Sequence, residues 1–383
     1  MSQRSTLSEL AALFLKLGTT AFGGPAAHIA MMEEEVVRRR GWLSHAQFLD
    51  LLGATNLIPG PNSTEMALHI GYLRAGWKGL LVAGTCFIVP ATLMVAMIAA
   101  AYLRFGALPV GVGLLYGIKP VVIVVVVQAL WQLGRTAAKT SGLAFLGLAA
   151  VALTLAGVNE LVVLLVAGLV VVGVRWIGAR RRGGAAMWGL APLGPLASAG
   201  ATIGATAAIP FGLWPLFLCF LKIGAVLFGS GYVLLAFLRA DLVERWGWLS
   251  EAQLLDATAV GQVTPGPVFT TATFIGYILG GPMGAGVATV GIFLPAFCFV
   301  ALSGPLVPRL RQSRTAAAFL DGVNVGALAL MAVVTWQLGQ AAIIDRTTAL
   351  LAVASTAALF GMRINSMWLM LGGALVGLLH ALG

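Results

Sequence analysis

Long apolar segments alternate with short polar connections along the whole chain. Runs of mostly hydrophobic residues cover positions 80–103, 110–131, 161–174 and 287–307. They are helical in length and poor in turn residues, and about 20 apolar residues suffice for a helix to cross the ~30 Å hydrocarbon core of a bilayer. Barrel strands would instead alternate in segments of about ten residues. The pattern therefore predicts an all-α integral membrane protein.

The sequence contains an internal repeat. Pro-Gly-Pro occurs at 59–61 and again at 265–267, and a Gly-Trp-Leu-Ser sequence precedes it in both places, always at a spacing of 206 positions. Beyond a one-residue deletion the spacing is 205, so that Trp-Gln-Leu-Gly at 131–134 recurs at 336–339. We therefore expect an N-terminal repeat at 1–177, a linker at 178–212 and a C-terminal repeat at 213–383.

The helical segments before and after each Pro-Gly-Pro are too short to span a membrane. The segments 44–47 and 250–253 both read Ser-x-x-Gln, the capping-box pattern of a helix start. From 44 to 58 there are about 14 residues, or roughly 21 Å of helix. The segments after Pro-Gly-Pro, up to Arg74 and Gly280, are equally short. The simplest geometry is a re-entrant hairpin that turns at Pro-Gly-Pro, and the alternative is a kink in one spanning helix.

Each outgoing half-helix would direct free N–H groups and a positive dipole end at a cavity, which predicts an anion site. The first copy is the more polar, because the second has Val268 and Phe269 directly after its break. The substrate-binding candidates at the two breaks are Asn56, Pro59, Gly60, Pro61, Asn62, Ser63 and Thr64 in the first copy, and Gln262, Thr264, Pro265, Gly266 and Pro267 in the second.

A second break, Phe22-Gly23-Gly24, interrupts the first apolar run, and we count these three residues among the substrate-binding candidates. Lys16 and its repeat mate Lys222 lie six residues before the two copies of this break. A lysine in an apolar run is costly unless it snorkels, pairs or lines water. Its recurrence favours a role in the site, and snorkelling is the alternative.

Glu65 lies beside the first predicted anion site and has no acidic repeat mate. A carboxylate there would repel an anion unless it were protonated, so we expect a proton-coupling role; a salt bridge is the alternative. His69, four residues later on the same helix face, is a second proton-coupling candidate, and packing is its alternative role. Glu35 and Arg39 recur as Asp241 and Arg245, which predicts i,i+4 ion pairs in both copies.

The charges of the loops suggest that the two copies have opposite orientations. Successive connections carry 2, 1, 2, 0 and 4 Lys or Arg residues in the first copy, and 0, 3, 1 and 1 in the second. Positive loops mark the cytoplasmic side, so the copies form an inverted repeat, with the substrate site expected at their interface. An inverted arrangement allows two counts of membrane crossings. The first has nine full spans with four re-entrant elements and includes a spanning helix at 190–210. The second has ten spans, and that helix is then peripheral.

Composition agrees with a membrane protein and excludes several other classes. Hydrophobic residues make up 60% of the 383 residues and charged residues only 9%, against about 25% charged in soluble domains. The net charge of +10 does not indicate a nucleic-acid partner, because the basic residues lie mainly in loops. The three cysteines have no spacing typical of a metal site, and no cofactor or metal is expected.

The chain resembles the chromate ion transporter family over nearly its whole length. The segments FGGPAAHIAMMEEEVV, WLSHAQFLDLLGATNLIPGPNSTEMALHIGY and GTCFIVPA are similar to the family's N-terminal motifs, and PGPVFTTATFIGY to its C-terminal counterpart. The resemblance implies proton-coupled export of chromate across the bacterial inner membrane, with sulfate as a competing oxyanion. It also implies functional roles for residues 22–24, 56, 59–65 and 265–267. The second copy departs from the pattern, with Ser230 and Gly231 in place of Gly24 and Pro25.

We therefore predict a multi-pass secondary transporter with chromate or sulfate, protons and the lipid bilayer as its partners. A passive oxyanion channel and a sulfate-type importer are the alternatives, because both would use the same helix-end chemistry. An enzyme is not expected, since the chain has no metalloprotease, nucleophile-elbow, haem or flavin motif, and no Walker A loop indicates an ATP-driven pump. A homodimer is one oligomeric state that the sequence leaves open.

Overall fold

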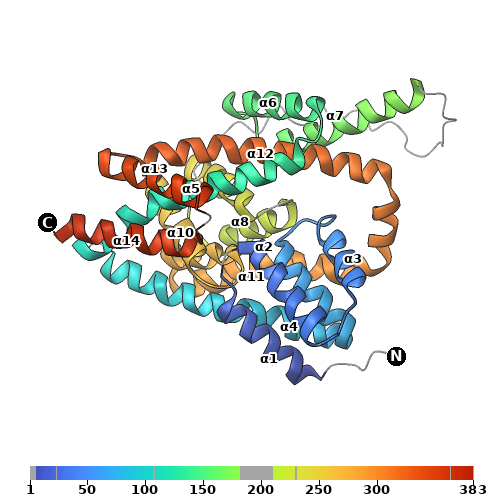
Figure 1. Ribbon diagram of the computed structural model, residues 1–383, viewed down its shortest axis with the longest axis horizontal. Coiled ribbons are helices and arrows are strands. Elements are labelled where there is room, and N and C mark those ends of the chain that lie inside the picture. Colours follow the sequence, from blue (N-terminus) through green and yellow to red (C-terminus); the bar gives the residue numbers. More distant parts are fainter. Residues whose placement is uncertain are drawn as a thin grey trace.

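The computed structural model describes residues 6–22, 24–106, 108–181, 210–228, 231–362 and 364–382, with side chains for all of these except 179–181 and 304–312. Within this part of the chain every regular element is a helix (Figure 1), which confirms the all-α prediction. The α-helices are α1 (Leu7–Thr20), α2 (Gly24–Glu33), α3 (His45–Thr55), α4 (Asn62–Phe105), α5 (Pro109–Ala137), α6 (Ser141–Leu155), α7 (Glu160–Arg181), α8 (Leu213–Val226), α9 (Leu234–Leu238), α10 (Glu251–Val263), α11 (Thr271–Gln312), α12 (Arg314–Ala342), α13 (Arg346–Phe360) and α14 (Ser366–Leu382). Short π-helical and 3-10 turns complete them: η1 (Glu34–Arg39), η2 (Gly231–Val233), η3 (Arg239–Arg245) and η4 (Val268–Thr270).

Both predicted helix starts before the Pro-Gly-Pro breaks are confirmed. Ser44 caps α3 and Ser250 caps α10, each accepting a hydrogen bond from the backbone of the glutamine three residues later, whose side chain bonds back. α3 ends at Thr55 and α10 at Val263, so both helices stop just before Pro-Gly-Pro. At 11 and 13 residues, neither is long enough to cross a bilayer.

The half-helix after each Pro-Gly-Pro folds back on the helix that follows it. α4 leaves helical torsion angles at Ala75 and Gly76, where Gly76 has φ 62°. Gly71 and Gly79 then face each other so closely that a Cβ on Gly71 would lie 2.3 Å from the Gly79 carbonyl oxygen. Residues 62–74 and 77–105 are therefore the two arms of a tight helical hairpin.

The second copy repeats this hairpin with nearly identical torsion angles. Gly280 and Gly281 have φ −139° and 62°, against −143° and 62° at Ala75 and Gly76. A Cβ on Gly276 would likewise lie 2.3 Å from the Gly284 carbonyl oxygen. The sequence repeat is thus a repeat of backbone structure.

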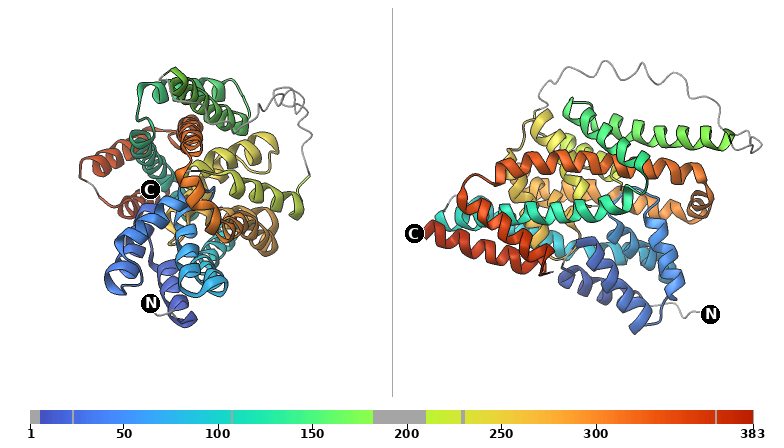
Figure 2. Two further views of the ribbon diagram at one scale, coloured as in Figure 1. Left: turned by 90° about the vertical axis from the view of Figure 1, so that its right-hand side faces the viewer. Right: turned by 45° about the horizontal axis from the view of Figure 1, so that its top comes forward.

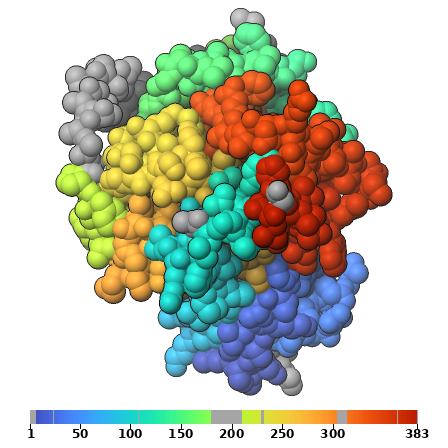
Figure 3. Space-filling view, turned by 90° about the vertical axis from the view of Figure 1, so that its left-hand side faces the viewer, coloured from blue at the N-terminus to red at the C-terminus, as the bar shows by residue number. Residues whose placement is uncertain are grey.

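The two copies are intertwined in a reciprocal way. α7 of the first copy packs on α12 of the second, and their repeat mates α14 and α5 pack on each other. Figures 1 and 2 show α12 running beneath α6 and α7, and Figure 3 shows the end of α14 beside the region where α4 passes into α5. Such exchanged contacts are what a two-fold relation between the copies requires. Their inversion across a membrane stays a prediction, as do the boundaries of the repeats and the linker.

Five helices in the described residues, α4, α5, α7, α11 and α12, are long and apolar enough to cross a membrane. Four shorter apolar helices, α6, α8, α13 and α14, accompany them. Large apolar side chains face outward, among them Met97, Phe145 and Leu148, which are 65%, 74% and 69% exposed. Apolar surface of this extent is typical of contact with lipid. Nine or ten crossings remain a prediction, and the helix expected at 190–210 lies outside the described residues except for Pro210.

Candidate functional site

The first Pro-Gly-Pro break joins two polar helix ends. Asn56 closes α3 and Asn62 opens α4, and the Asn62 side-chain amide donates a hydrogen bond of 2.8 Å to Asn56 Oδ1. The Pro61 carbonyl oxygen accepts from the backbone N–H groups of Thr64 and Glu65. Asn62 and Ser63 therefore present the first N–H groups of α4, which have no partner within a helix. This is the helix end at which the sequence predicts an anion.

At the second Pro-Gly-Pro break, the threonine hydroxyls bond to backbone carbonyl oxygens of the same segment. Thr264 Oγ1 donates to the Val260 carbonyl oxygen, Thr270 Oγ1 to that of Pro267 and Thr271 Oγ1 to that of Val268, each at 2.8 Å. The Gln262 side-chain oxygen accepts from the Tyr232 hydroxyl at 3.5 Å. The second copy therefore offers fewer free donors at its helix end than the first.

The two Pro-Gly-Pro turns are bonded across the copies. The Gly60 N–H donates to the Leu227 carbonyl oxygen at 2.8 Å, and the Gly266 N–H donates to the Ala21 carbonyl oxygen at 2.9 Å. Gly60 and Gly266 are repeat mates, and so are Ala21 and Leu227. Each Pro-Gly-Pro turn is thus fixed to the residue that ends α1 or α8 in the other copy.

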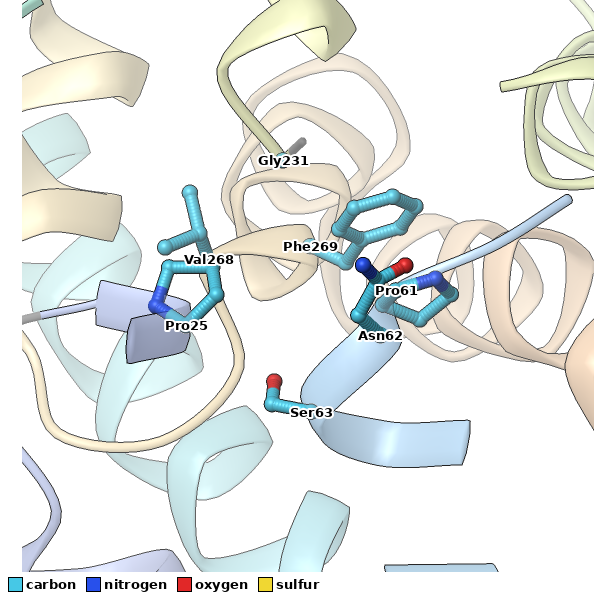
Figure 4. A pocket seen from close by; sticks show the side chains of 7 residues that line it. All are labelled: Pro25, Pro61, Asn62, Ser63, Gly231, Val268 and Phe269. Atoms are coloured by element: carbon cyan, nitrogen blue, oxygen red, sulfur yellow. The ribbon is translucent and has the colours of Figure 1, made fainter. Parts of the chain in front are cut away.

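A small cavity lies between the two turns, with a volume of about 10 Å³, roughly the space that one water molecule needs. Figure 4 shows its lining residues, with the Ser63 hydroxyl directed toward it. Three pairs of repeat mates contribute to the wall, Pro25 with Gly231, Asn62 with Val268 and Ser63 with Phe269, together with Pro61. Because mates from both copies line it, the cavity lies at the interface of the repeats. Its polar wall comes from the first copy.

The Glu65 side chain lies against the glycine of the first Pro-Gly-Pro. It is fully buried, and neither carboxyl oxygen has a hydrogen-bond partner among the described residues. A Cβ on Gly60 would lie 2.3 Å from Glu65 Oε1, so the absence of a side chain at Gly60 makes room for the carboxyl group. The salt bridge considered for Glu65 is not formed. A buried carboxyl group without a partner avoids a large desolvation cost by staying protonated.

His69 and Thr64 extend this buried polar strip on α4. His69 is 7% exposed and Thr64 is fully buried, and His69 Nε2 and Thr64 Oγ1 have no partner in the described part of the chain. His69 lies one turn beyond Glu65, but no hydrogen bond joins the two side chains. The structure therefore places the two proton-coupling candidates on one helix without linking them.

The two repeated lysines form ion pairs and are not among the residues that line the cavity. Lys16 Nζ lies 2.7 Å from Glu35 Oε1, which Arg39 also approaches at 3.3 Å. In the second copy, Lys222 and Arg245 pair with Asp241 in the same way. The predicted i,i+4 pairs are present in both copies. The hydrogen bond from Lys16 is the largest cause that holds the pKa of Glu35 below its ordinary value, partly offset by desolvation.

The remaining candidates belong to the Phe22-Gly23-Gly24 break that follows α1. Phe22 is 38% exposed, and Gly24 has φ 77° with the Tyr232 hydroxyl near the position that a Cβ would occupy. Gly23 and Ser230 lie outside the described residues.

Comparison with known proteins decides the family. A family model described as "Chromate transporter" matches residues 8–173 and 214–378. The chain belongs to the chromate transporter family. The chromate transport protein of Cupriavidus metallidurans is 33% identical over 97% of this chain and 93% of its own length. The chromate transport protein of Pseudomonas aeruginosa is 32% identical over 87% and 81%, and no solved structure matches.

Membership confirms the expected transporter class and excludes an enzyme, because this is a family of transporters. With its apolar helices, the chain is a multi-pass membrane protein. An uncharacterized transporter of Methanocaldococcus jannaschii is also similar, at 26% identity over 84% of this chain.

Two features of this transporter were not found from the sequence. His28 is buried, and its Nε2 lies 3.0 Å from the Ala21 carbonyl oxygen, the same atom that accepts from Gly266. The second feature is an ion pair between Lys119 of the first copy and Asp256 of the second. A lone lysine inside the apolar run of α5 was the available signal for the latter, and its partner is 137 positions away in the sequence.

Proposed function

We propose that this protein is a secondary transporter that moves chromate, or a related tetrahedral oxyanion such as sulfate, out of the bacterial cytoplasm across the inner membrane, coupled to the movement of protons. The observation that carries the proposal is the cavity between the two Pro-Gly-Pro turns, at the N-terminus of α4 and lined by repeat mates. Helix N-termini bind anions through free N–H groups and the helix dipole. Transporters built from inverted repeats bind their substrates between the repeats.

Asn62 and Ser63 are the proposed side-chain donors to the oxyanion. Both line the cavity from the first turn of α4, beside the N–H groups that are free at the start of a helix. A volume of about 10 Å³ is too small for an anion of five heavy atoms. The two turns must therefore separate for the substrate to enter, and rocking of one copy against the other would do this.

Glu65 is the proposed coupling group. Its carboxyl group is buried against Gly60, in the turn that precedes the anion site. A dianion bound at this helix end repels an ionised carboxylate and so favours the protonated form. By linkage, protonation of Glu65 strengthens anion binding by the same factor, and this reciprocity couples the two movements.

The test is chromate flux into proteoliposomes with and without a pH gradient. We expect Asn62→Ala to reduce flux about tenfold, the loss expected for one hydrogen bond to a charged group. Glu65→Gln should bind chromate but lose the dependence on the gradient. Val268 is the repeat mate of Asn62, so Val268→Ala controls for a changed cavity volume. Glu34→Gln, at a side chain that is 42% exposed, controls for a lost carboxylate.

Three results would contradict the proposal in distinct ways. Gradient-independent flux of the wild type would indicate a passive channel. Gradient-dependent flux that persists in Glu65→Gln would remove that residue from the coupling. Normal flux in Asn62→Ala would mean that the first Pro-Gly-Pro break has a structural role and does not bind the anion. Separately, competition by sulfate in the same assay ranks the affinities for the two oxyanions.

A further inference from the structure

A buried charged cluster joins the two copies at α10, the helix that precedes the second Pro-Gly-Pro. Lys119 is the only charged residue of α5 before Arg135. Its Nζ lies 2.9 Å from Asp256 Oδ1 in α10, and the Tyr102 hydroxyl, near the end of α4, donates to Asp256 Oδ2 at 3.0 Å. α4 and α5 belong to the first copy and α10 to the second.

Stability alone does not explain this cluster. The side chains of Asp256 and Lys119 are only 6% and 19% exposed. Replacing a buried ion pair by apolar residues is often neutral or stabilising, and a charged residue inside a membrane span marks a functional site by default. The Lys119 side chain is also the more exposed of the two.

The cluster occurs once, despite the repeat. The position equivalent to Asp256 in the first copy is Asp50, which is exposed. The positions equivalent to Lys119 and Tyr102 in the second copy are Asn324 and Val307. The two-fold framework of the backbone therefore does not require this group.

Lys119 and Tyr102 have the arrangement of an oxyanion receptor. The Lys119 ammonium pairs with one oxygen of the Asp256 carboxylate and the Tyr102 hydroxyl donates to the other, and a tetrahedral oxyanion presents pairs of oxygens in a similar way. An ammonium group has three donors, so it can approach a second anion before it releases the first. We propose that Lys119 and Tyr102 form a second oxyanion station, in which the Asp256 carboxylate is the resident anion that the transported oxyanion displaces.

This station rests on the proposed oxyanion transport and adds a second position to it. Passage of an ion requires binding that is strong enough for entry and weak enough for exit. A resident carboxylate meets both needs, because it weakens substrate binding at Lys119 by competition and refills the site when the substrate leaves.

The test is equilibrium binding of radiolabelled chromate to the purified full-length protein in detergent. Asp256→Asn removes the competing anion, and we expect it to tighten binding about tenfold, whereas Lys119→Gln should weaken it about tenfold. The double variant, which leaves no unpaired buried charge, should also bind more weakly than the wild type. Tyr102→Phe should give a smaller loss of affinity.

An ion pair that includes none of the site candidates provides the matched control. Arg239→Gln and Glu251→Gln remove the charges of a pair between η3 and α10, whose side chains are 13% and 34% exposed, and neither should change chromate affinity. Opposite shifts for Asp256→Asn and Lys119→Gln, absent from these controls, would support the station, because a merely structural pair would lose stability from either side without such a split.

Two outcomes are separable. If the wild type binds no chromate at all, the proposed function fails. If the wild type binds chromate but the double variant of Lys119 and Asp256 binds it equally well, the station is wrong and the pair is structural, while the site at Asn62 is unaffected.

Discussion

Substituting Gly60 by alanine tests the placement of the Glu65 carboxyl group. The new Cβ would lie 2.3 Å from Glu65 Oε1. Since non-bonded heavy atoms prefer about 3.5 Å, the carboxyl group would have to move by roughly 1 Å. Overpacking of this kind costs about 1–3 kcal/mol. The φ of 141° at Gly60 adds a backbone strain of about 1–3 kcal/mol for any residue with a side chain.

The two contributions can be separated by variants. Gly157→Ala isolates the cost of a positive φ, because Gly157 has φ 79° and no atom lies within 4 Å of its added Cβ. In Gly60→Ala/Glu65→Ala the clash is removed and only strain remains. We therefore expect Gly60→Ala to lower the thermal unfolding midpoint more than Gly157→Ala does, and Glu65→Ala to restore part of that loss.

The assay is unfolding of the purified protein in detergent, followed by intrinsic fluorescence, with all four variants in one buffer. A non-additive effect of about 1–3 kcal/mol between Gly60 and Glu65 is expected for side chains in direct contact. The reasoning is refuted if the double variant is as unstable as the two single changes added together. The carboxyl group would then not lie over Gly60, and its coupling role would lose its structural basis.

Two further predictions concern the frame around the site. Gly71→Ala should destabilise the protein strongly, because its Cβ would meet the Gly79 carbonyl oxygen at 2.3 Å, whereas Gly173→Ala, with open space in α7, should not; thermal unfolding compares them. Lys16→Met should lower the unfolding midpoint near pH 7. Because the pKa of Glu35 is lowered in the folded protein, the ion pair stabilises the fold at pH values above the ordinary pKa of 4.5, and this stabilisation is lost as the pH falls through the lowered pKa. The difference in unfolding midpoint between Lys16→Met and the wild type should therefore vanish on acidification. A difference that stays constant with pH would contradict the pairing.

The sequence predicts local structure here better than it predicts partners. Ser-x-x-Gln places the starts of α3 and α10 correctly because a capping box involves only residues three apart. The i,i+4 pair of Glu35 and Arg39 follows from helix geometry in the same way. Lys16 joins that pair from 19 positions away, so its recurrence in both copies indicated importance without identifying the partner.

Long-range contacts required the structure. The bond from Gly266 to Ala21 joins two breaks that the sequence treats separately, and no periodicity connects them. Asp256 was visible only as the repeat mate of Asp50, and its contact with Tyr102 spans 154 positions. By contrast, the Pro-Gly-Pro motif itself predicted a turn between half-helices, because proline and glycine restrict the backbone locally.

The two copies share a backbone but not a chemistry, and transport gives a reason for both. The hairpin kinks agree within a few degrees at Gly76 and Gly281, and two equivalent halves can exchange conformations so that an inward-facing and an outward-facing state have similar free energies. Coupling needs the two halves to differ in their side chains, since a proton and an anion must bind at particular groups. Glu65 is found in one copy and Asp256 is buried in the other. In the function proposed above, the symmetric frame permits the movement, and the groups that the repeat does not duplicate couple it to the proton and the anion.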